Sequence, residues 1–184
     1  MVGYVVMAVV VLAVLYAIAT YNRLVRQRNL VREGWSGIDV QLRRRADLVP
    51  NLVETVKGYT AHERGLFEEI AASRQQSLAA KAPGEQGEAE RRLEGGIGRL
   101  MALAEAYPEL KADANFRQLQ GQFAEVEDQL QMARRYYNGT TRDLNTLVQS
   151  FPSNLVAGGF GFKEAEFFET DEASRTAPQV SFAR

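Results

Sequence analysis

The first 22 residues constrain the fold of this chain most, because they contain no charged side chain. The segment reads MVGYVVMAVVVLAVLYAIATYN, and the first charge is Arg23. As a helix rising ~1.5 Å per residue it is roughly 33 Å long, enough to cross a hydrocarbon core of ~30 Å. A lone span in lipid must be helical to satisfy its own backbone groups. Residues 1–22 are therefore predicted to form a transmembrane anchor.

A cleaved signal peptide is the alternative interpretation, because Ala17-Ile18-Ala19 resembles a cleavage site. A signal peptide carries positive charge before its apolar core, whereas here four arginines follow it: Arg23, Arg26, Arg28 and Arg32. This order favours an uncleaved anchor with the N-terminus outside and the body in the cytoplasm. The same arginines are candidates for contact with anionic lipid, or serve only as a topology signal.

The composition excludes several functional classes. With 22 Lys and Arg against 23 Asp and Glu, the net charge of −1 argues against nucleic-acid binding through bulk positive charge. The chain has no cysteine, so thiolate metal sites and thiol nucleophiles are excluded. His62-Glu63 begins like the HExxH zinc motif, but Leu66 stands where the second histidine belongs. We predict no catalytic residue, no metal site and no cofactor.

The body shows the heptad spacing of packed long helices. After the anchor, apolar residues follow at steps of 3, 4 or 7 from Leu24 to Val49, and the phase continues to Ile70. Pro50 interrupts this phase without resetting it, which favours a kinked long helix over a helix that ends there. Residues 81–87 predict a loop, and a second helix resumes at Leu93.

The third predicted body helix runs from Phe116 to Phe151, with Asn115 as its cap, and its apolar steps alternate strictly between 3 and 4. We therefore predict an all-α fold, with an N-terminal transmembrane helix continuing into an elongated antiparallel, coiled-coil-like bundle. The predicted segments are the anchor (1–22), a cytoplasmic helical bundle (23–157) and an aromatic, acidic tail (158–184). The Arg43-Arg44-Arg45 cluster is expected on a solvated face, with a partner contact as the alternative.

Five of the nine phenylalanines lie in the predicted tail. The tail rings either pack onto the end of the bundle or dock on a neighbouring subunit or partner. The candidate residues for such a contact are Phe160, Phe162, Phe167 and Phe168.

Several stretches closely resemble the LemA family of bacterial membrane-anchored proteins. They are YNRLVRQRNLVREGWSGIDVQLRRRADLVPNLVETVKGYTAHE (21–63), AYPELKADANFRQLQ (106–120), ARRYYN (133–138), FPSN (151–154) and FGFKEAEFFE (160–169). The resemblance covers nearly the whole chain. It implies one span in the bacterial inner membrane, a cytoplasmic helical bundle and no established enzymatic activity. One branch of the family is associated with magnetosome membrane formation, which implies a role in membrane organisation.

Polar residues of the family blocks predict a contact inside the bundle. Asp47, Pro50 and Asn51 gather on the first long helix, and Arg134, Tyr137 and Asn138 on the third. Aligning the heptads of the two helices places the two sets side by side. A buried carboxylate needs a charged or amide partner, so we predict that the two sets form a contact. A ligand pocket at this place is the alternative.

Two functions account best for these residues. The first is a non-enzymatic scaffold that contacts the lipid bilayer, forms a homo-oligomer and organises membrane or membrane-associated partners. The second is an adaptor, monomeric or a small oligomer, that presents its tail or the Pro50 region to an unidentified signalling or envelope protein. An unrecognised hydrolase is the third and least supported reading of the residues.

Overall fold

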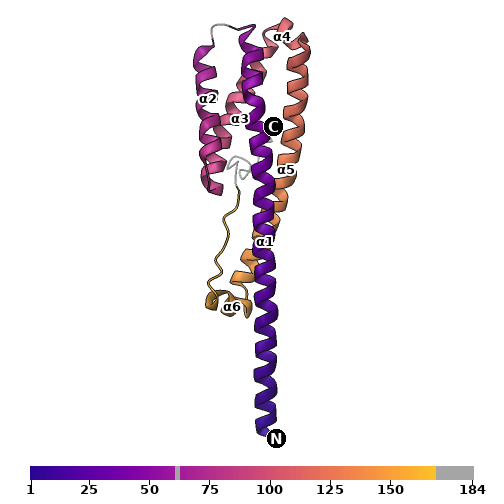
Figure 1. Ribbon diagram of the computed structural model, residues 1–184, viewed down its shortest axis with the longest axis vertical. Helices are drawn as coiled ribbons and strands as arrows, with labels where there is room; N and C mark the ends of the chain where they lie inside the picture. The colour runs from indigo at the N-terminus through magenta and orange to yellow at the C-terminus, as the bar shows by residue number, and fades with distance from the viewer. Residues whose placement is uncertain (61–62, 169–184) are drawn as a thin grey trace, which may run out of the picture. The chain divides into compact units, whose positions relative to one another are not determined.

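The computed structural model describes residues 1–60 and 63–168. Their elements are α1 (Val2–Lys57), α2 (Arg64–Ala79), α3 (Pro83–Glu105), α4 (Pro108–Ala112), α5 (Ala114–Gln149) and α6 (Ser153–Gly159), drawn in Figure 1. No strand occurs within these two ranges, and a long apolar helix leads into further helices, so the predicted all-α class is confirmed. His62 and the part of the predicted tail from 169 to 184 lie outside the described residues.

The chain divides into two compact units. The first unit comprises Met1–Asp39 and Gln131–Phe167, and the described part of the second comprises residues 40–60, 63–130 and 168. Helices α1 and α5 each contribute one part to each unit. The two units collect residues that lie close in space, whereas the predicted segments, with boundaries at residues 22 and 157, are continuous in sequence. Those boundaries stay a prediction.

Helix α1 continues through Pro50 and ends at Lys57. The prediction that the proline does not end the helix is therefore correct. The same prediction carried the helical phase on to Ile70, and this is wrong, because Gly58 follows the last helical residue. The amides of Tyr59 and Thr60 both donate to the Val56 carbonyl, at 3.0 and 3.1 Å, and so close the end of the helix.

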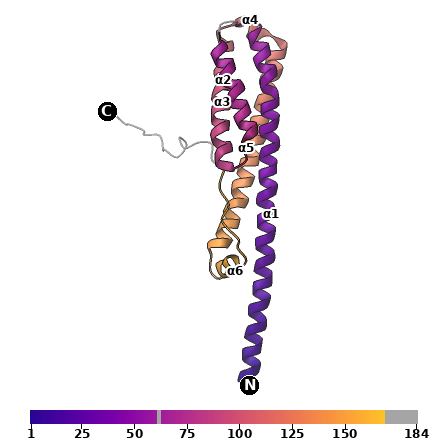
Figure 2. The same ribbon diagram turned by 60° about the vertical axis from the view of Figure 1, so that its left-hand side comes forward.

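The predicted loop at 81–87 is shorter than expected, because α3 begins at Pro83. Proline suits the first turn of a helix, where its missing N–H has no acceptor. Gln86 then donates to the Ser77 carbonyl at 3.0 Å, which ties the new helix to α2. Figures 1 and 2 both show α2 and α3 side by side.

Each unit pairs α1 and α5 in opposite directions, as predicted. In the first unit, Gln27 donates to Asp143 at 3.4 Å, and a Cβ at Gly34 would lie 3.0 Å from the Cα of Tyr137. In the second unit, Arg44 pairs with Glu125 at 3.1 Å. Further along, Tyr59 donates to Asp113 at 3.1 Å. Residue numbers fall along α5 as they rise along α1, which defines the antiparallel arrangement within each unit.

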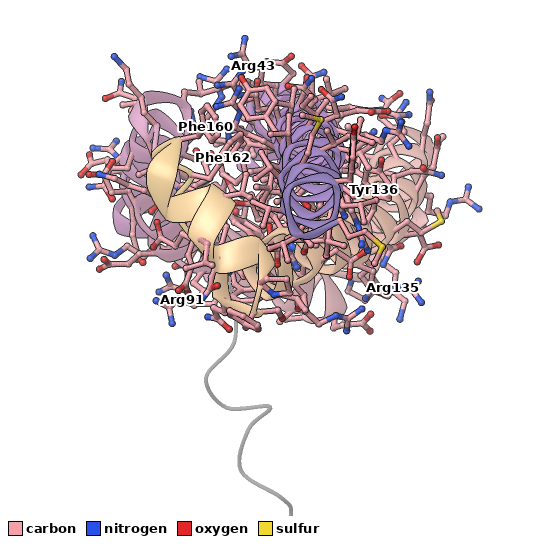
Figure 3. All side chains as sticks on the ribbon, turned by 90° about the horizontal axis from the view of Figure 1, so that it is seen from below. Arg43, Arg91, Arg135, Tyr136, Phe160 and Phe162 are labelled. Carbon is pink, nitrogen blue, oxygen red and sulfur yellow. The ribbon has the colours of Figure 1, made fainter. Side chains whose placement is uncertain are left out.

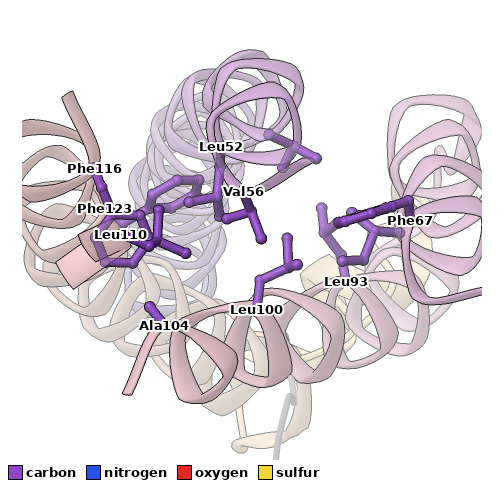
Figure 4. Packing of buried hydrophobic residues seen from close by; sticks show 11 residues of the cluster. Leu52, Val56, Phe67, Leu93, Leu100, Ala104, Leu110, Phe116 and Phe123 are labelled. Carbon is purple, nitrogen blue, oxygen red and sulfur yellow. The ribbon is translucent and has the colours of Figure 1, made fainter. Parts of the chain in front are cut away.

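The core of the second unit joins five helices (Figure 4). It consists of buried aliphatic and aromatic side chains, namely Val49, Leu52, Val56, Phe67, Ile70, Leu93, Leu100, Ala104, Leu110, Phe116 and Phe123. Most of these residues occupy the 3-and-4 seam positions that the sequence predicts. Phe151, the last predicted seam residue, is instead 79% exposed. The helical ladder ends at Gln149, two residues before it.

Candidate membrane-proximal site

The apolar beginning of α1 is the part of the described chain that is long and apolar enough to cross a membrane. An 18-residue window of it has a mean hydropathy of 2.6, and none of that window is buried. Burial along α1 begins at Thr20 and Leu24, which lie one turn apart and are 7% and 0% exposed. The exposed apolar surface thus ends where the packed part of the first unit begins.

The predicted lipid-proximal arginines follow directly on α1. Arg23, Arg26, Arg28 and Arg32 are all exposed. The guanidinium carbon of Arg28 lies 5.0 Å from the ring centroid of Phe162, a cation–π geometry. Arg28 therefore contacts the aromatic tail, while Arg26 and Arg23, two and five residues before it, are exposed.

Two of the predicted tail rings pack against α1. The ring of Tyr21 lies 4.9 Å from that of Phe160 and 5.7 Å from that of Phe162. Phe162 is only 9% exposed, whereas Phe160 keeps 64% of its surface exposed. Figure 3 shows the two rings on the same side of the α1 ribbon. Residues predicted separately as lipid-proximal and as tail contacts thus meet in one cluster.

The chain after Phe162 is held by hydrogen bonds to α5. Asn145 donates its amide to the Ala165 carbonyl at 2.9 Å and accepts from the Ala165 amide at 2.8 Å. The Tyr137 hydroxyl donates to the Glu166 carbonyl at 2.6 Å. Burial raises the pKa of Tyr137, whose ring also lies 5.5 Å from that of Trp35. Sequence reasoning missed Asn145, although it follows the seam residue Leu144.

The other tail rings differ in exposure. Phe167 is 40% exposed, and Phe168, which belongs to the second unit, is 2% exposed. A role of these rings in contact with a partner stays a prediction.

The second unit contains a buried charge network that sequence reasoning missed. Arg45 and Glu90 are both 0% exposed, with Nη1 3.0 Å from Oε2. Arg45 also binds Glu127, and Glu90 accepts hydrogen bonds from Ser77 and from Gln86, the latter at 3.1 Å. The network joins α1, α2, α3 and α5.

The solvated face expected for Arg43-Arg44-Arg45 is therefore wrong for its last member. Arg45 lies three residues after the seam residue Leu42 and four before Val49. That spacing places it on the buried face, and it is the signal that could have identified it. Arg43 and Arg44 are exposed.

A sequence model of the LemA family matches residues 34–182, which is most of the chain. The chain belongs to the LemA family. It is similar to magnetosome proteins MamQ 1 and MamQ 2 of Paramagnetospirillum magneticum, each 28% identical over 200 residues, covering 92% of this chain and 74% of the relative. It is also similar to Protein LemA of Metamycoplasma hominis, 23% identical, covering 89% of this chain and 75% of that protein.

The polar residues shared with the LemA pattern fall in different units. In the second unit, Asp47, Pro50 and Asn51 are exposed, and Asp47 has an ion pair with Arg74 at 3.8 Å. Asn51 borders an open surface hollow of about 420 Å³, together with Thr55, Gln118 and Gln122. In the first unit, Tyr137 is buried, and Arg134 and Asn138 are partly buried. The predicted contact between the two sets stays a prediction.

The buried charged side chains of this LemA-family chain, Arg45 and Glu90, pair with each other. Across residues 1–60 and 63–168, no group of three or more His, Asp or Glu side chains is placed to hold a metal ion. The buried carboxylate of Glu90 accepts hydrogen bonds from Arg45, Ser77 and Gln86. Features at the surface include the exposed apolar start of α1, the arginines that follow it and the aromatic cluster.

Proposed function

We propose that this chain is a non-enzymatic scaffold anchored in the bacterial inner membrane, which self-assembles and organises membrane or membrane-associated partners. The observation that carries the proposal is the course of α1. Its first part is apolar and unburied, and the same helix continues without a break into both packed units. Such a helix couples the position of the body to the bilayer.

The charge distribution supports a single span with the N-terminus outside. Residues 23–32 hold four arginines and no acid, and no charged side chain precedes them. Positive residues near a span are retained on the cytoplasmic side. The body then lies in the cytoplasm. The names of the MamQ relatives place those proteins with magnetosomes, which fits a family that works at membranes.

Single cysteines test this topology cleanly, because the native chain has none. Tyr4→Cys places a thiol near the outer end of the predicted span, and Leu78→Cys places one in the body after it; the native side chains are 81% and 48% exposed. In spheroplasts, a membrane-impermeant maleimide should label Tyr4→Cys and should reach Leu78→Cys only after lysis. The reverse labelling contradicts the proposed orientation. Equal labelling of both in intact spheroplasts contradicts a span.

Self-assembly is supported by surfaces that the chain leaves uncovered. The apolar window of α1 is unburied, and Ala13 and Ala17 in it form a small-residue pair that lets helices approach closely. Met132 and Tyr136 on α5 are 48% and 46% exposed. Contacts between copies at either surface remove apolar area from water or lipid.

An adaptor is the second candidate, because the hollow beside Asn51 lies next to Pro50 in the family block. Removal of residues 158–184 separates the two functions. Loss of a cellular partner with self-assembly retained favours an adaptor that uses its tail. Loss of self-assembly itself favours the scaffold.

A further inference from the structure

The turn after α5 displays an uncharged apolar surface. Residues 144–162 contain no charged side chain. Within this stretch Phe151 is 79% exposed, Leu155 is 66% exposed and Phe160 is 64% exposed. Large apolar side chains gathered on a surface mark a contact with a partner or with lipid.

These exposed side chains lie on a turn that hydrogen bonds hold in place. Ser153 Oγ donates to the carbonyls of Leu147 and Ser150, at 2.7 and 2.9 Å. The amide of Phe162 donates to the Ala157 carbonyl at 2.9 Å. Ser153 and Ala157, one turn apart, are buried, which directs Leu155 away from the packed face.

The position of this surface along α1 indicates what it contacts. Phe160 lies against Tyr21, which is the penultimate residue of the uncharged segment. Arg28, against Phe162, lies seven residues later, or about 10 Å along the helix. Figure 1 shows α6 beside this stretch of α1 within the first unit. The turn therefore sits at the level where the apolar span gives way to arginines.

We propose that α6 and its flanking rings form a second membrane contact, with Phe151, Leu155 and Phe160 inserted at the boundary between headgroups and acyl chains of the cytoplasmic leaflet. This inference rests on the proposed anchor. Aromatic and aliphatic side chains favour that boundary, and neighbouring cations attract anionic headgroups. Exposed Arg23 and Arg26 supply those cations. Continuity with the span distinguishes lipid from a protein partner.

Spin labels on single cysteines measure this contact directly in the full-length protein. Phe151→Cys and Leu155→Cys replace exposed side chains, so neither substitution removes buried packing. Ser36→Cys, at an exposed position on α1 in the same unit, is the matched control, and Leu12→Cys reports on the anchor itself. Each variant is reconstituted in phosphatidylcholine vesicles with and without phosphatidylglycerol. Collision rates are then measured with oxygen, which enters lipid, and with a water-soluble nickel chelate.

The oxygen-to-nickel collision ratio should be several-fold higher at positions 151 and 155 than at 36, and highest at 12. Phosphatidylglycerol should raise the ratio at 151 and 155 further, because the arginines then have anionic partners. If position 12 lies in lipid while the ratios at 151 and 155 match the ratio at 36, the anchor stands and the second contact is refuted. Labels at 151 and 155 shielded from both reagents show that a protein surface covers the turn, which also refutes it. Nickel access at position 12 overturns the anchor and the inference together.

Discussion

Arg45 and Glu90 show how single residues fix the pairing of four helices. Removing two charges from water costs several kcal/mol per ion, which only good geometry and further hydrogen bonds offset. Here the Glu90 carboxylate accepts hydrogen bonds from Arg45, Ser77 and Gln86, and Arg45 also donates a hydrogen bond to Glu127. A shifted register in the second unit would leave these groups buried without partners. We therefore expect the network to favour one register among those that a heptad seam allows.

Replacing Glu90 with Gln should destabilise the second unit strongly. The substitution keeps the shape but leaves the buried Arg45 cation short of its carboxylate, and loss of one partner of a buried pair costs ~3–5 kcal/mol. Glu88→Gln on the same helix is the control, because Glu88 pairs with Arg92 on the surface and is 59% exposed. It should change stability by less than ~1 kcal/mol. Denaturant unfolding followed by circular dichroism measures both, and equal midpoints would contradict the buried role.

Gly34 lets α1 approach α5 closely in the first unit. A Cβ there would meet the backbone of Tyr137 at 3.0 Å, whereas a Cβ at Gly37 meets nothing within 4 Å. Gly34→Ala should therefore destabilise by ~1–3 kcal/mol through overpacking. Gly37→Ala should stabilise by roughly 0.5–1 kcal/mol, since alanine favours a helix interior. Thermal unfolding of the two variants checks the opposite signs, and the same sign for both would contradict a close helix contact at Gly34.

At the scale of elements, the 3-and-4 apolar spacing predicted the long helices, because a helix with one buried stripe needs that period. It predicted α1 through Pro50 and nearly all of α5. The spacing failed to predict the helix ends, because single residues determine where a helix begins or stops. These residues are Gly58 after α1, Pro83 at the start of α3 and Asp113 before α5. Helix α6 was missed because its seven residues are too few to show a period.

The candidate site could be predicted only in parts. The arginines and the tail rings were each identified from the sequence, but more than 130 positions separate Tyr21 from Phe160 along the chain. Only the antiparallel return of α5 and the turn at α6 bring them together. The two hydrogen bonds between the Asn145 side chain and Ala165 use the backbone groups of Ala165, which side-chain patterns do not reveal.

Asp113, rather than the predicted Asn115, caps α5. The Phe116 amide donates to its carboxylate at 2.9 Å, and this bond is the main cause that lowers the pKa of Asp113 below its usual 3.8. A lowered pKa contributes stability above pH 3.8 that is lost as the pH falls through the folded-state pKa. Asp113→Ala should therefore lower the melting temperature at pH 7 and flatten its fall below pH 3.8. Asn115→Ala is the control, and a larger effect of that substitution would contradict the cap.

At the scale of the whole molecule, the proposed anchor and the first helical stretch of the body form one continuous helix, α1. The described residues offer hydrogen-bonded packing and exposed apolar surface, and the proposed work of the chain is attachment and contact. Assembly of copies in the membrane is the part of this account that goes furthest beyond the fold. It is also the part on which a scaffold depends.

Crosslinking of the full-length protein in its native membranes tests that claim most directly. A single cysteine at Tyr136, 46% exposed on α5, provides a defined site on a chain that otherwise has none. With a homobifunctional maleimide, the scaffold predicts a band at twice the 20.5 kDa chain mass at native expression level. Bands of still higher mass should appear when a second cysteine, at Ala13, also crosslinks copies through the span. A band at 20.5 kDa alone, for both sites and at every crosslinker length and expression level, would contradict self-assembly.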